Sequence, residues 1–196
     1  CRDPAPYLVI YVHSAPAHLE QRTLIRKTYA HPHNVPGIVV RTLFAIGVSA
    51  AHQEALSEES AMYGDILQED YVDSYRNLSL KALSALRFIN AQCQHARFVL
   101  KCDDDIFVNI FALVRHLQSL EEGSPAPNSI FCFLWPYMPV MRDPKSKWYV
   151  SQEEWPQEAY TNYCSGSAFV LTLPVVTAIV NVVPITAYHW VDDFYV

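Results

Sequence analysis

The chain has 196 residues, of which 51% are hydrophobic and 13% aromatic, so it carries enough apolar material to bury the core of a globular domain. This composition excludes a disordered chain. The formal net charge is −6, and the 14 Lys and Arg residues are scattered along the sequence, which argues against a nucleic-acid or anionic membrane surface. Any anionic ligand must therefore be met by local positive charge.

Strands and helices alternate in the first half. The run over 7–12 is β-branched and aromatic and ends before Ser14, which is typical of a buried strand followed by a turn. The next segment predicts a helix that projects Arg22 and Arg26 from one face, because they are four residues apart. The predicted elements are a strand over 7–12, a helix over 18–29, a strand over 38–46, helices over 51–63 and 75–90, and a strand over 97–100. This rhythm predicts an α/β fold with a Rossmann-like, mostly parallel central sheet flanked by helices.

The second half gives weaker signals. Asn109 is a good N-cap for a helix whose apolar residues lie on one face. Further on, 130–133 and 168–172 read as strands, while 174–183 fits either a short apolar helix or another strand. We expect one domain over 1–196, truncated at both ends, with a first half over 1–122 and a smaller second half over 123–196.

Three consecutive carboxylates, Asp103, Asp104 and Asp105, follow the predicted strand over 97–100 and precede the apolar segment 106–108. Like charges repel, and apolar flanks predict a partly buried site where that repulsion is poorly screened. In an extended segment Asp103 and Asp105 point to the same face, so we expect this pair to converge on a hard divalent cation such as Mg²⁺ or Mn²⁺. An exposed, solvated turn is the alternative, which the apolar flanks disfavour.

Several further blocks occur in a fixed order. Segments 22–29, 70–81 and 101–109 look like R-x-x-I-R-x-T-W, D-x-x-D-S-Y-x-N-L-T-L-K and K-x-D-D-D-x-F-V-N. Segments 147–151, 163–171 and 192–196 look like K-W-Y-V-S, Y-C-S-G-x-G-Y-V-L and E-D-V-Y-V. Together they resemble the β-1,3-galactosyltransferase and β-1,3-N-acetylglucosaminyltransferase family over nearly the whole chain. The departures are Tyr29 for Trp, Ala168 for Gly and Asp192 for Glu, and none of the eight histidines can be assigned to the metal-ligand His expected beyond Val196.

The resemblance implies an inverting enzyme of glycosyltransferase-A fold that uses a UDP-sugar and Mn²⁺, with Mg²⁺ as the alternative ion. It implies that 1–122 is the nucleotide-sugar-binding half and 123–196 the acceptor-side half. The implied metal ligands are Asp105 and Asp103, and the implied donor-nucleotide residues are Arg22, Arg26, Lys101, Asp103 and Asp104. For Arg22 and Arg26 the alternative is a solvated helix face.

The second half supplies the other implied site residues. Asp193 is the candidate base, since inverting transfer needs a proton acceptor opposite the leaving group; a helix cap is its alternative. Trp148 is a candidate for stacking on a sugar ring, with core packing as the alternative, which we prefer for Trp155. Gly166 is expected to allow close approach of the donor, or to serve a turn.

The resemblance also suggests partners and a compartment. The expected donor is UDP-galactose or UDP-N-acetylglucosamine, and the expected acceptor is a glycan of a glycoprotein, glycolipid or proteoglycan. We expect no nucleic acid, and no membrane contact except through an anchor absent from this chain, as in a single-pass type II protein of the Golgi lumen. Two other classes stay open: a non-catalytic carbohydrate-binding relative with an incomplete site, and a metal-dependent phosphohydrolase.

The secretory pathway brings two further expectations. Asn77 begins an N-x-S sequon and is a candidate glycosylation site. Five cysteines with no C-x-x-C pair disfavour a structural zinc site and leave at least one thiol unpaired. We predict that this thiol is Cys102, because a disulfide there would restrict the neighbouring carboxylates, and that Cys93 and Cys164 form disulfides in an oxidising lumen.

Overall fold

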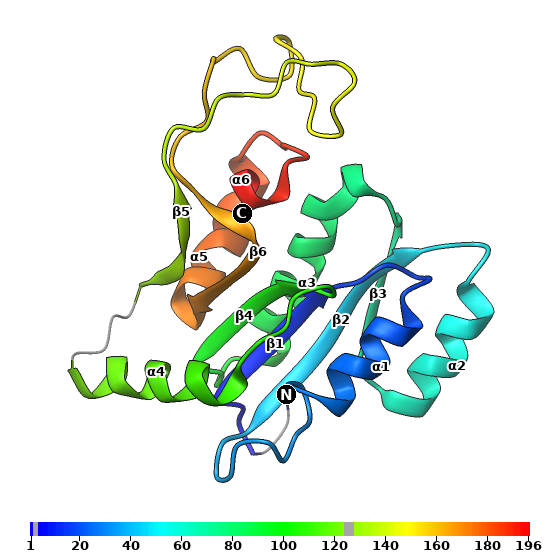
Figure 1. Ribbon diagram of the computed structural model, residues 1–196, viewed down its shortest axis with the longest axis vertical. Helices are drawn as coiled ribbons and strands as arrows, with labels where there is room; N and C mark the ends of the chain where they lie inside the picture. Colours follow the sequence, from blue (N-terminus) through cyan, green and yellow to red (C-terminus); the bar gives the residue numbers. More distant parts are fainter. Residues whose placement is uncertain (2–3, 124–127) are drawn as a thin grey trace.

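A single six-stranded sheet forms the centre of the computed structural model, which describes residues 1, 4–123 and 128–196. Its strands lie in the order β3-β2-β1-β4-β6-β5, as Figure 1 shows. Strands β1 to β4 are mutually parallel, and β6 lies antiparallel between β4 and β5. The predicted α/β fold with a mostly parallel sheet is therefore confirmed. The strand bounds are β1 Leu8–His13, β2 Val40–Val48, β3 Ile66–Val72, β4 Phe98–Asp103, β5 Ile130–Trp135 and β6 Tyr163–Thr172.

Helices cover both faces of the sheet. Side chains of α1, α2 and α4 join one core cluster with the even-numbered positions of β1, while α3 and α5 join a second cluster with Val9 and Tyr11. All six residues of β1 are buried, which explains why its sequence is a continuous apolar run. The helix bounds are α1 Leu19–Lys27, α2 Gln53–Tyr63, α3 Leu78–Gln92, α4 Ile110–Gly123, α5 Leu173–Val182 and α6 Asp192–Tyr195, with 3₁₀ turns at Tyr75–Asn77 and Val183–Ile185.

Most predicted elements are present with small shifts at their ends. Asn109 caps α4, because its side-chain oxygen accepts a hydrogen bond from the Ala112 amide at 3.0 Å. The ambiguous segment over 174–183 is helical. Strand β3 is missing from the predicted elements because it is an edge strand whose Glu69 and Asp70 are exposed, so its sequence lacks a continuous apolar pattern.

The strand order places the ends of β1 and β4 at the centre of the sheet. From β1 the chain proceeds to β2 and β3 on one side, whereas β4 adds on the other side. His13 and Asp103, the last residues of β1 and β4, are partners in register. Open α/β sheets bind ligands at such a change of direction. The long loop over 136–162 lies above this end of the sheet (Figure 1).

Disulfides connect Cys1 with Cys93 and Cys132 with Cys164, and all five cysteines lie in the described part of the chain. Cys102 is the remaining free thiol and is buried on β4. The predicted cysteine assignment is confirmed. Among the described residues, no helix has the length and apolar character required to cross a bilayer.

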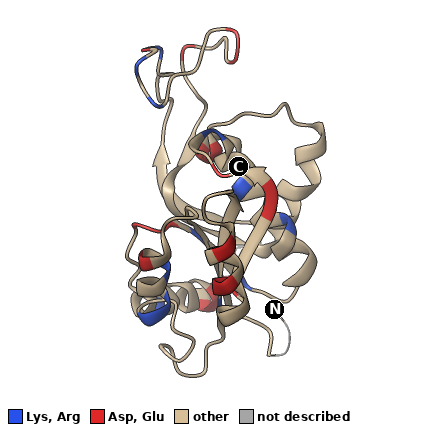
Figure 2. Cartoon of the chain, turned by 90° about the vertical axis from the view of Figure 1, so that its right-hand side faces the viewer, with Lys and Arg blue, Asp and Glu red and all other residues tan. Residues whose placement is uncertain are grey.

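Charged side chains occur both on the surface and inside the fold. Figure 2 shows Lys and Arg dispersed among Asp and Glu on one side of the chain. Among the described residues, three Lys and Arg side chains are instead buried: Arg22 is 1% exposed, Lys101 2% and Lys81 3%. Buried charges require partners. The partners of Lys101 include Asp103 at the end of β4, and those of Arg22 and Lys81 include Ser14, which follows β1.

Candidate active site

The acidic triplet begins on a strand and ends in a turn. Strand β4 ends at Asp103, and the Ile106 amide donates to the Asp103 carbonyl at 3.2 Å to close a turn over Asp104 and Asp105. The expectation that Asp103 and Asp105 share a face through strand alternation is therefore wrong, because alternation stops where the strand stops. The idle, solvated turn is also excluded, since two of the three carboxylates have internal partners.

Asp103 is held by a buried lysine. Lys101 Nζ lies 2.6 Å from Asp103 Oδ1, and Lys101 also donates to the carbonyl of Gly166 on β6. Burial raises the pKa of Asp103 above its usual range, Lys101 opposes this rise, and the charges of Asp105 and Asp104 add to it. The lysine thus offsets repulsion within the triplet.

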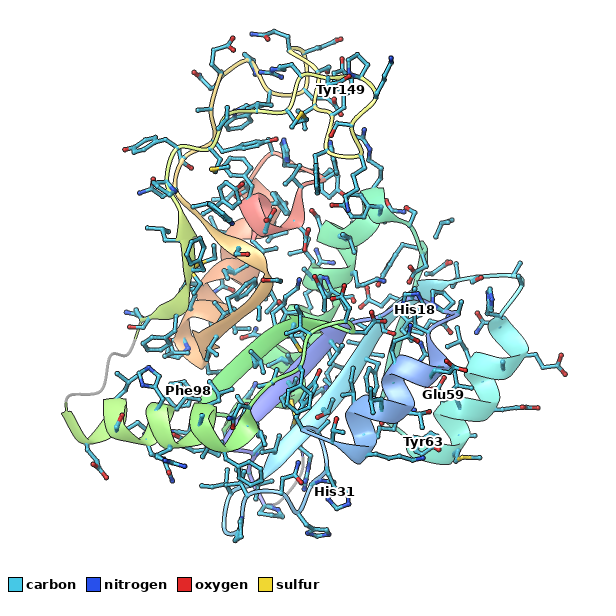
Figure 3. The ribbon with its side chains drawn as sticks, viewed as in Figure 1. His18, His31, Glu59, Tyr63, Phe98 and Tyr149 are labelled. Carbon is cyan, nitrogen blue, oxygen red and sulfur yellow. A yellow bond between two sulfur atoms is a disulfide. The ribbon has the colours of Figure 1, made fainter. Side chains whose placement is uncertain are left out.

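The other two aspartates have different surroundings. Asp104 Oδ2 lies 2.8 Å from His18 Nδ1, at the start of α1, where Figure 3 labels His18. Asp105 is exposed, and no hydrogen bond or ion pair from a described residue reaches it. Asp105 is therefore the carboxylate of the triplet that can accept an external ligand without breaking an internal contact.

A second pair of carboxylates approaches from α6. Asp192 Oδ2 lies 3.7 Å from His13 Nδ1 and 4.0 Å from Lys101 Nζ. His13 Nδ1 lies 4.0 Å from Asp103 Oδ1, so the ends of β1, β4 and α6 meet at one point. Burial raises the pKa of Asp192 to about 6, with Lys101 opposing the rise and Asp193 and Asp103 adding to it. Carboxylates from both halves of the chain therefore converge here.

His13 lies inside this cluster, in surroundings that favour the neutral imidazole. Burial holds the pKa of His13 well below its usual range, and the charges of Lys101 and Lys81 lower it further. Neither ring nitrogen has a hydrogen-bond partner among the described residues. The sequence offered no signal for this histidine, since it ends an ordinary apolar strand.

Gly166 makes room for Asp193. Its amide donates to Asp193 Oδ2 at 3.3 Å, and a Cβ at position 166 would lie 2.9 Å from Asp193 Cβ. Gly166 lies within β6, so the expected turn is wrong, and the close approach of the donor stays a prediction. Burial raises the pKa of Asp193 above its usual range, while its backbone hydrogen bond with Gly166 and the charge of Lys101 lower it.

Arg22 and Arg26 share a carboxylate partner on α2. Glu59 Oε2 lies 2.6 Å from Arg22 Nη2, and Glu59 Oε1 lies 2.7 Å from Arg26 Nη2. Arg26 also pairs with Asp65 through Nε at 2.7 Å. Figure 3 shows Glu59 on α2 beside α1. The predicted common face is confirmed, and the solvated face is excluded for Arg22.

Arg22 also holds the loop between β1 and α1. Its Nη1 donates to Ser14 Oγ at 3.0 Å and to the Ala15 carbonyl at 2.6 Å. Lys81 reaches the same loop from α3, donating to the Ser14 carbonyl at 2.6 Å, and pairs with Asp73 at 2.9 Å. The loop that carries His18 is therefore fixed by two buried cations. Direct contact of Arg22, Arg26 or Lys101 with a nucleotide stays a prediction.

Trp148 and Trp155 lie in the long loop over 136–162, between β5 and β6. Trp148 is 51% exposed, so core packing is excluded for it, and its Nε1 donates to Tyr75 Oη at 2.7 Å. Lys147 Nζ lies 4.6 Å from the centroid of the Trp148 ring. Trp155 instead packs against Tyr160 and Phe194 in a small core, as preferred. A sugar contact of Trp148 stays a prediction.

The sequon at Asn77 has a structural use. Asn77 Nδ2 donates to the Val72 carbonyl at 2.8 Å, and the buried Ser79 hydroxyl donates to the His189 carbonyl at 2.7 Å. These bonds join α3 to the strand before it and to the segment that leads into α6. Glycosylation of Asn77 stays a prediction.

The donor atoms present suit a hard divalent cation in part. Among the described residues, no group of three or more His, Cys, Asp or Glu side chains is arranged to hold a metal ion. The exposed Asp105 and the half-buried Asp103 nevertheless carry carboxylate oxygen atoms two residues apart at one turn, and carboxylate oxygen is the ligand type that Mg²⁺ and Mn²⁺ prefer. Such ions keep several waters and bind through one or two carboxylates plus substrate phosphates. The triplet fits a metal that arrives with a phosphate ligand.

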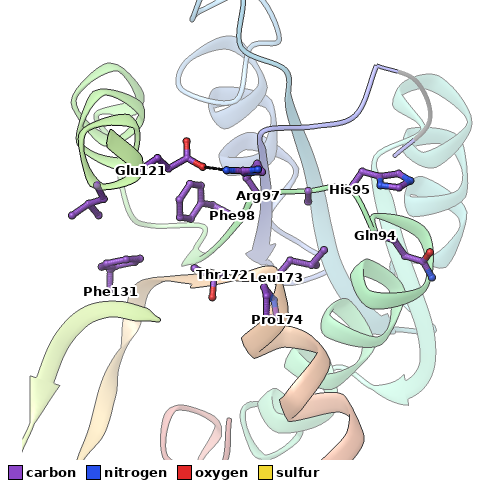
Figure 4. Close-up of a pocket in the computed structure, with 11 residues that line it drawn as sticks. Gln94, His95, Arg97, Phe98, Glu121, Phe131, Thr172, Leu173 and Pro174 are labelled. Carbon is purple, nitrogen blue, oxygen red and sulfur yellow. Dashed lines mark hydrogen bonds and ion pairs between the residues drawn. The ribbon is translucent and has the colours of Figure 1, made fainter. Parts of the chain in front are cut away.

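A separate cavity lies at the other end of β4, where that strand begins. It has a volume of about 430 Å³ and is lined mainly by apolar side chains, including Phe98 and Phe131. Figure 4 shows Arg97 and Glu121 paired at its edge. Phe98 begins β4 whereas Asp103 ends it, so this cavity is distinct from the carboxylate cluster.

Comparison with solved structures supports the fold class. A crystal structure of 4-diphosphocytidyl-2C-methyl-D-erythritol synthase from Anaerococcus prevotii matches with a TM-score of 0.52, covering 96% of this chain and 79% of that chain. The sequence identity is 11%, so the likeness concerns the fold alone. Both chains share the mixed α/β sheet architecture.

Sequence comparison defines the family. The Galactosyltransferase family model matches residues 20–196. The chain is 33% identical to beta-1,3-galactosyltransferase 5 of Pan paniscus over 100% of its own length and 65% of the relative's. It is 35% identical to beta-1,3-galactosyltransferase 4 of Rattus norvegicus over 98% of this chain and 59% of the relative. The chain belongs to the galactosyltransferase family, and it spans 63–66% of the length of the first curated relatives it matches.

Proposed function

We propose that the protein containing this chain is an inverting transferase that moves galactose from UDP-galactose to a glycan hydroxyl in β-1,3 linkage. The names of the relatives favour galactose, and UDP-N-acetylglucosamine is the alternative donor. The acceptor is a glycan of a glycoprotein, glycolipid or proteoglycan. The compartment that fits this activity is the Golgi lumen, reached as a single-pass type II membrane protein.

One observation carries the proposal. The triplet at the end of β4 and the pair Asp192 and Asp193 on α6 come from distant parts of the sequence and meet around Lys101 and His13. Transfer of a sugar from a nucleotide requires two functions beside each other: charge neutralisation on the leaving diphosphate and a base for the acceptor hydroxyl. The two carboxylate groups supply one function each.

Each side chain has a proposed role. Asp105 and Asp103 would hold Mn²⁺ or Mg²⁺, which neutralises the charge on the departing diphosphate. Asp193 accepts the proton of the attacking hydroxyl, and the Gly166 amide orients its carboxylate. The raised pKa of Asp193 makes it a stronger base than an exposed aspartate. Asp104, held by His18, faces the donor ribose.

Two substitutions in the full-length protein separate these roles. Asp193→Asn keeps the side-chain shape and removes the proton acceptor, so kcat should fall by about 10²–10⁴-fold while UDP affinity stays near that of the wild type. Asp105→Asn should weaken both turnover and Mn²⁺-dependent UDP binding, because it removes a metal ligand. Asp70→Asn, at an exposed position of β3, is the matched control and should change neither.

Calorimetry with UDP, Mn²⁺ and a chelator measures the binding step. Transfer is measured with UDP-galactose and UDP-N-acetylglucosamine against a panel of acceptor glycans. UDP affinity that is the same with and without metal would contradict the metal assignment. A wild-type protein that transfers no sugar with any pair, yet binds glycans, would identify a non-catalytic carbohydrate-binding relative instead.

A further inference from the structure

Lys101 contacts three separate elements of the site. Its ammonium lies 2.6 Å from Asp103 Oδ1 on β4 and 4.0 Å from Asp192 Oδ2 on α6, and it donates to the Gly166 carbonyl on β6. Gly166 in turn donates its amide to Asp193. Lys101 is therefore linked to the metal-binding turn directly and to the candidate base through one residue.

The burial of Lys101 limits what it can touch. The residue is 2% exposed, and its ammonium is directed at protein oxygen atoms. A buried ammonium and buried carboxylates each carry a large desolvation penalty, which their attraction offsets only when the geometry is well defined. This pairing therefore favours one arrangement of β4, β6 and α6 over others. It also argues against direct contact with a nucleotide, the role that the sequence resemblance implies for Lys101.

We propose that Lys101 is a positioning residue that sets the distance between Asp103 in the donor site and Asp193 in the acceptor site by holding Gly166 and Asp192. This inference rests on the proposed transferase function. It assigns Asp192 a role as an internal partner of Lys101, distinct from the role of Asp193 as base.

The test is a double-mutant cycle in the full-length protein. Lys101→Met removes the ammonium and retains the aliphatic chain, and Asp192→Asn removes one of its partners. Misplacement of a reacting group by about 1 Å costs about 10²-fold, so Lys101→Met should lower kcat by that factor and UDP affinity by much less. Because both changes break one linkage, the double variant should lose no more than the worse single variant.

Lys81→Met is the matched control for burial. Lys81 is also a buried lysine paired with an aspartate, Asp73, but no hydrogen bond or ion pair among the described residues joins it to α6. Its effect on kcat should multiply with that of Asp192→Asn, since no hydrogen bond or ion pair between described residues joins the two side chains. Thermal unfolding of every variant separates loss of folded protein from loss of kcat in the folded fraction.

Each outcome of the cycle either supports or overturns the positioning role of Lys101. If the effects of Lys101→Met and Asp192→Asn on kcat multiply, the two residues act separately and the positioning role is overturned. If Lys101→Met instead lowers UDP affinity and leaves kcat intact, the positioning role is also overturned and direct contact with the donor is restored. If Lys101→Met does not fold, Asp192→Asn alone provides the test. An unchanged kcat of Asp192→Asn would refute the linkage. A lower kcat with retained UDP affinity would support it. If the wild type transfers no sugar, the proposed function fails. The linkage is then tested by the same cycle in the free energy of unfolding, where non-additive effects support it and additive effects overturn it.

Discussion

Substitution of Gly166 by alanine tests the contact between β6 and the candidate base. A methyl group at position 166 would lie 2.9 Å from Asp193 Cβ and 3.2 Å from its Cγ and Oδ2. Carbon atoms pack at about 3.5–4.0 Å, so Asp193 has to retreat by roughly 0.6–1.1 Å. The nearest atom is a Cβ attached to the backbone of α6, so a side-chain rotation does not relieve the contact.

The expected cost has two parts. Overpacking at this contact should lower the free energy of unfolding by about 1–3 kcal/mol. Displacement of Asp193 by about 1 Å should lower kcat by up to about 10²-fold. UDP affinity should change little, because the triplet lies at and just after the end of β4, and Gly166→Ala adds its methyl group on β6.

Thermal unfolding, UDP calorimetry and transfer kinetics on Gly166→Ala provide the measurements. Gly123→Ala is the control, since no heavy atom of the described chain lies within 4 Å of a Cβ added there. The control should match the wild type in kcat. A Gly166→Ala protein with wild-type kcat would refute both the contact and the role of Asp193.

Two further predictions concern buried groups outside the chemistry. Burial alone would raise the pKa of Glu59, but hydrogen bonds from Arg22 and Arg26 outweigh it and lower the pKa below 4.5. Glu59→Gln should therefore lower the free energy of unfolding by about 3–5 kcal/mol above pH 4.5. The difference in unfolding free energy between variant and wild type should shrink as the pH falls through the lowered pKa of Glu59. Unfolding measured over a range of pH checks both expectations. Burial raises the pKa of Cys102 to about 11, so a thiol reagent should label this residue only after the protein unfolds. Mass spectrometry of the unfolded, non-reduced protein should then find one label per chain. Rapid labelling of the native protein would contradict the burial of Cys102.

The sequence predicts elements where one local pattern determines the structure. Strand β1 is buried at every position, and α4 carries a clear apolar face behind the Asn109 cap, so both are evident from sequence. Strand β3 escapes prediction because the sheet leaves its Glu69 and Asp70 exposed. The antiparallel insertion of β6 beside β4 also has no local signal, because strand direction depends on partners distant in sequence.

Some residues of the candidate site can be predicted from the sequence, and others cannot. The triplet is visible because three adjacent carboxylates are unusual between apolar segments. The partners of the buried cations are not visible: Glu59 lies 37 residues from Arg22, and nothing near Glu59 in sequence marks it as buried. His13 and His18 likewise reach Asp103 and Asp104 only after the sheet brings the ends of β1 and β4 together.

The internal charges suggest how an acidic chain could bind the anionic donor that we propose. The three buried cations, Arg22, Lys81 and Lys101, are each committed to a carboxylate of the protein, so their charge stabilises loops and strand ends. Little of it remains to meet a diphosphate, whereas Asp105 is exposed with no internal partner among the described residues. A bare diphosphate would be repelled by this carboxylate, but a diphosphate that carries a divalent cation would be attracted to it. We therefore expect the proposed donor to bind as its metal complex in preference to the free nucleotide.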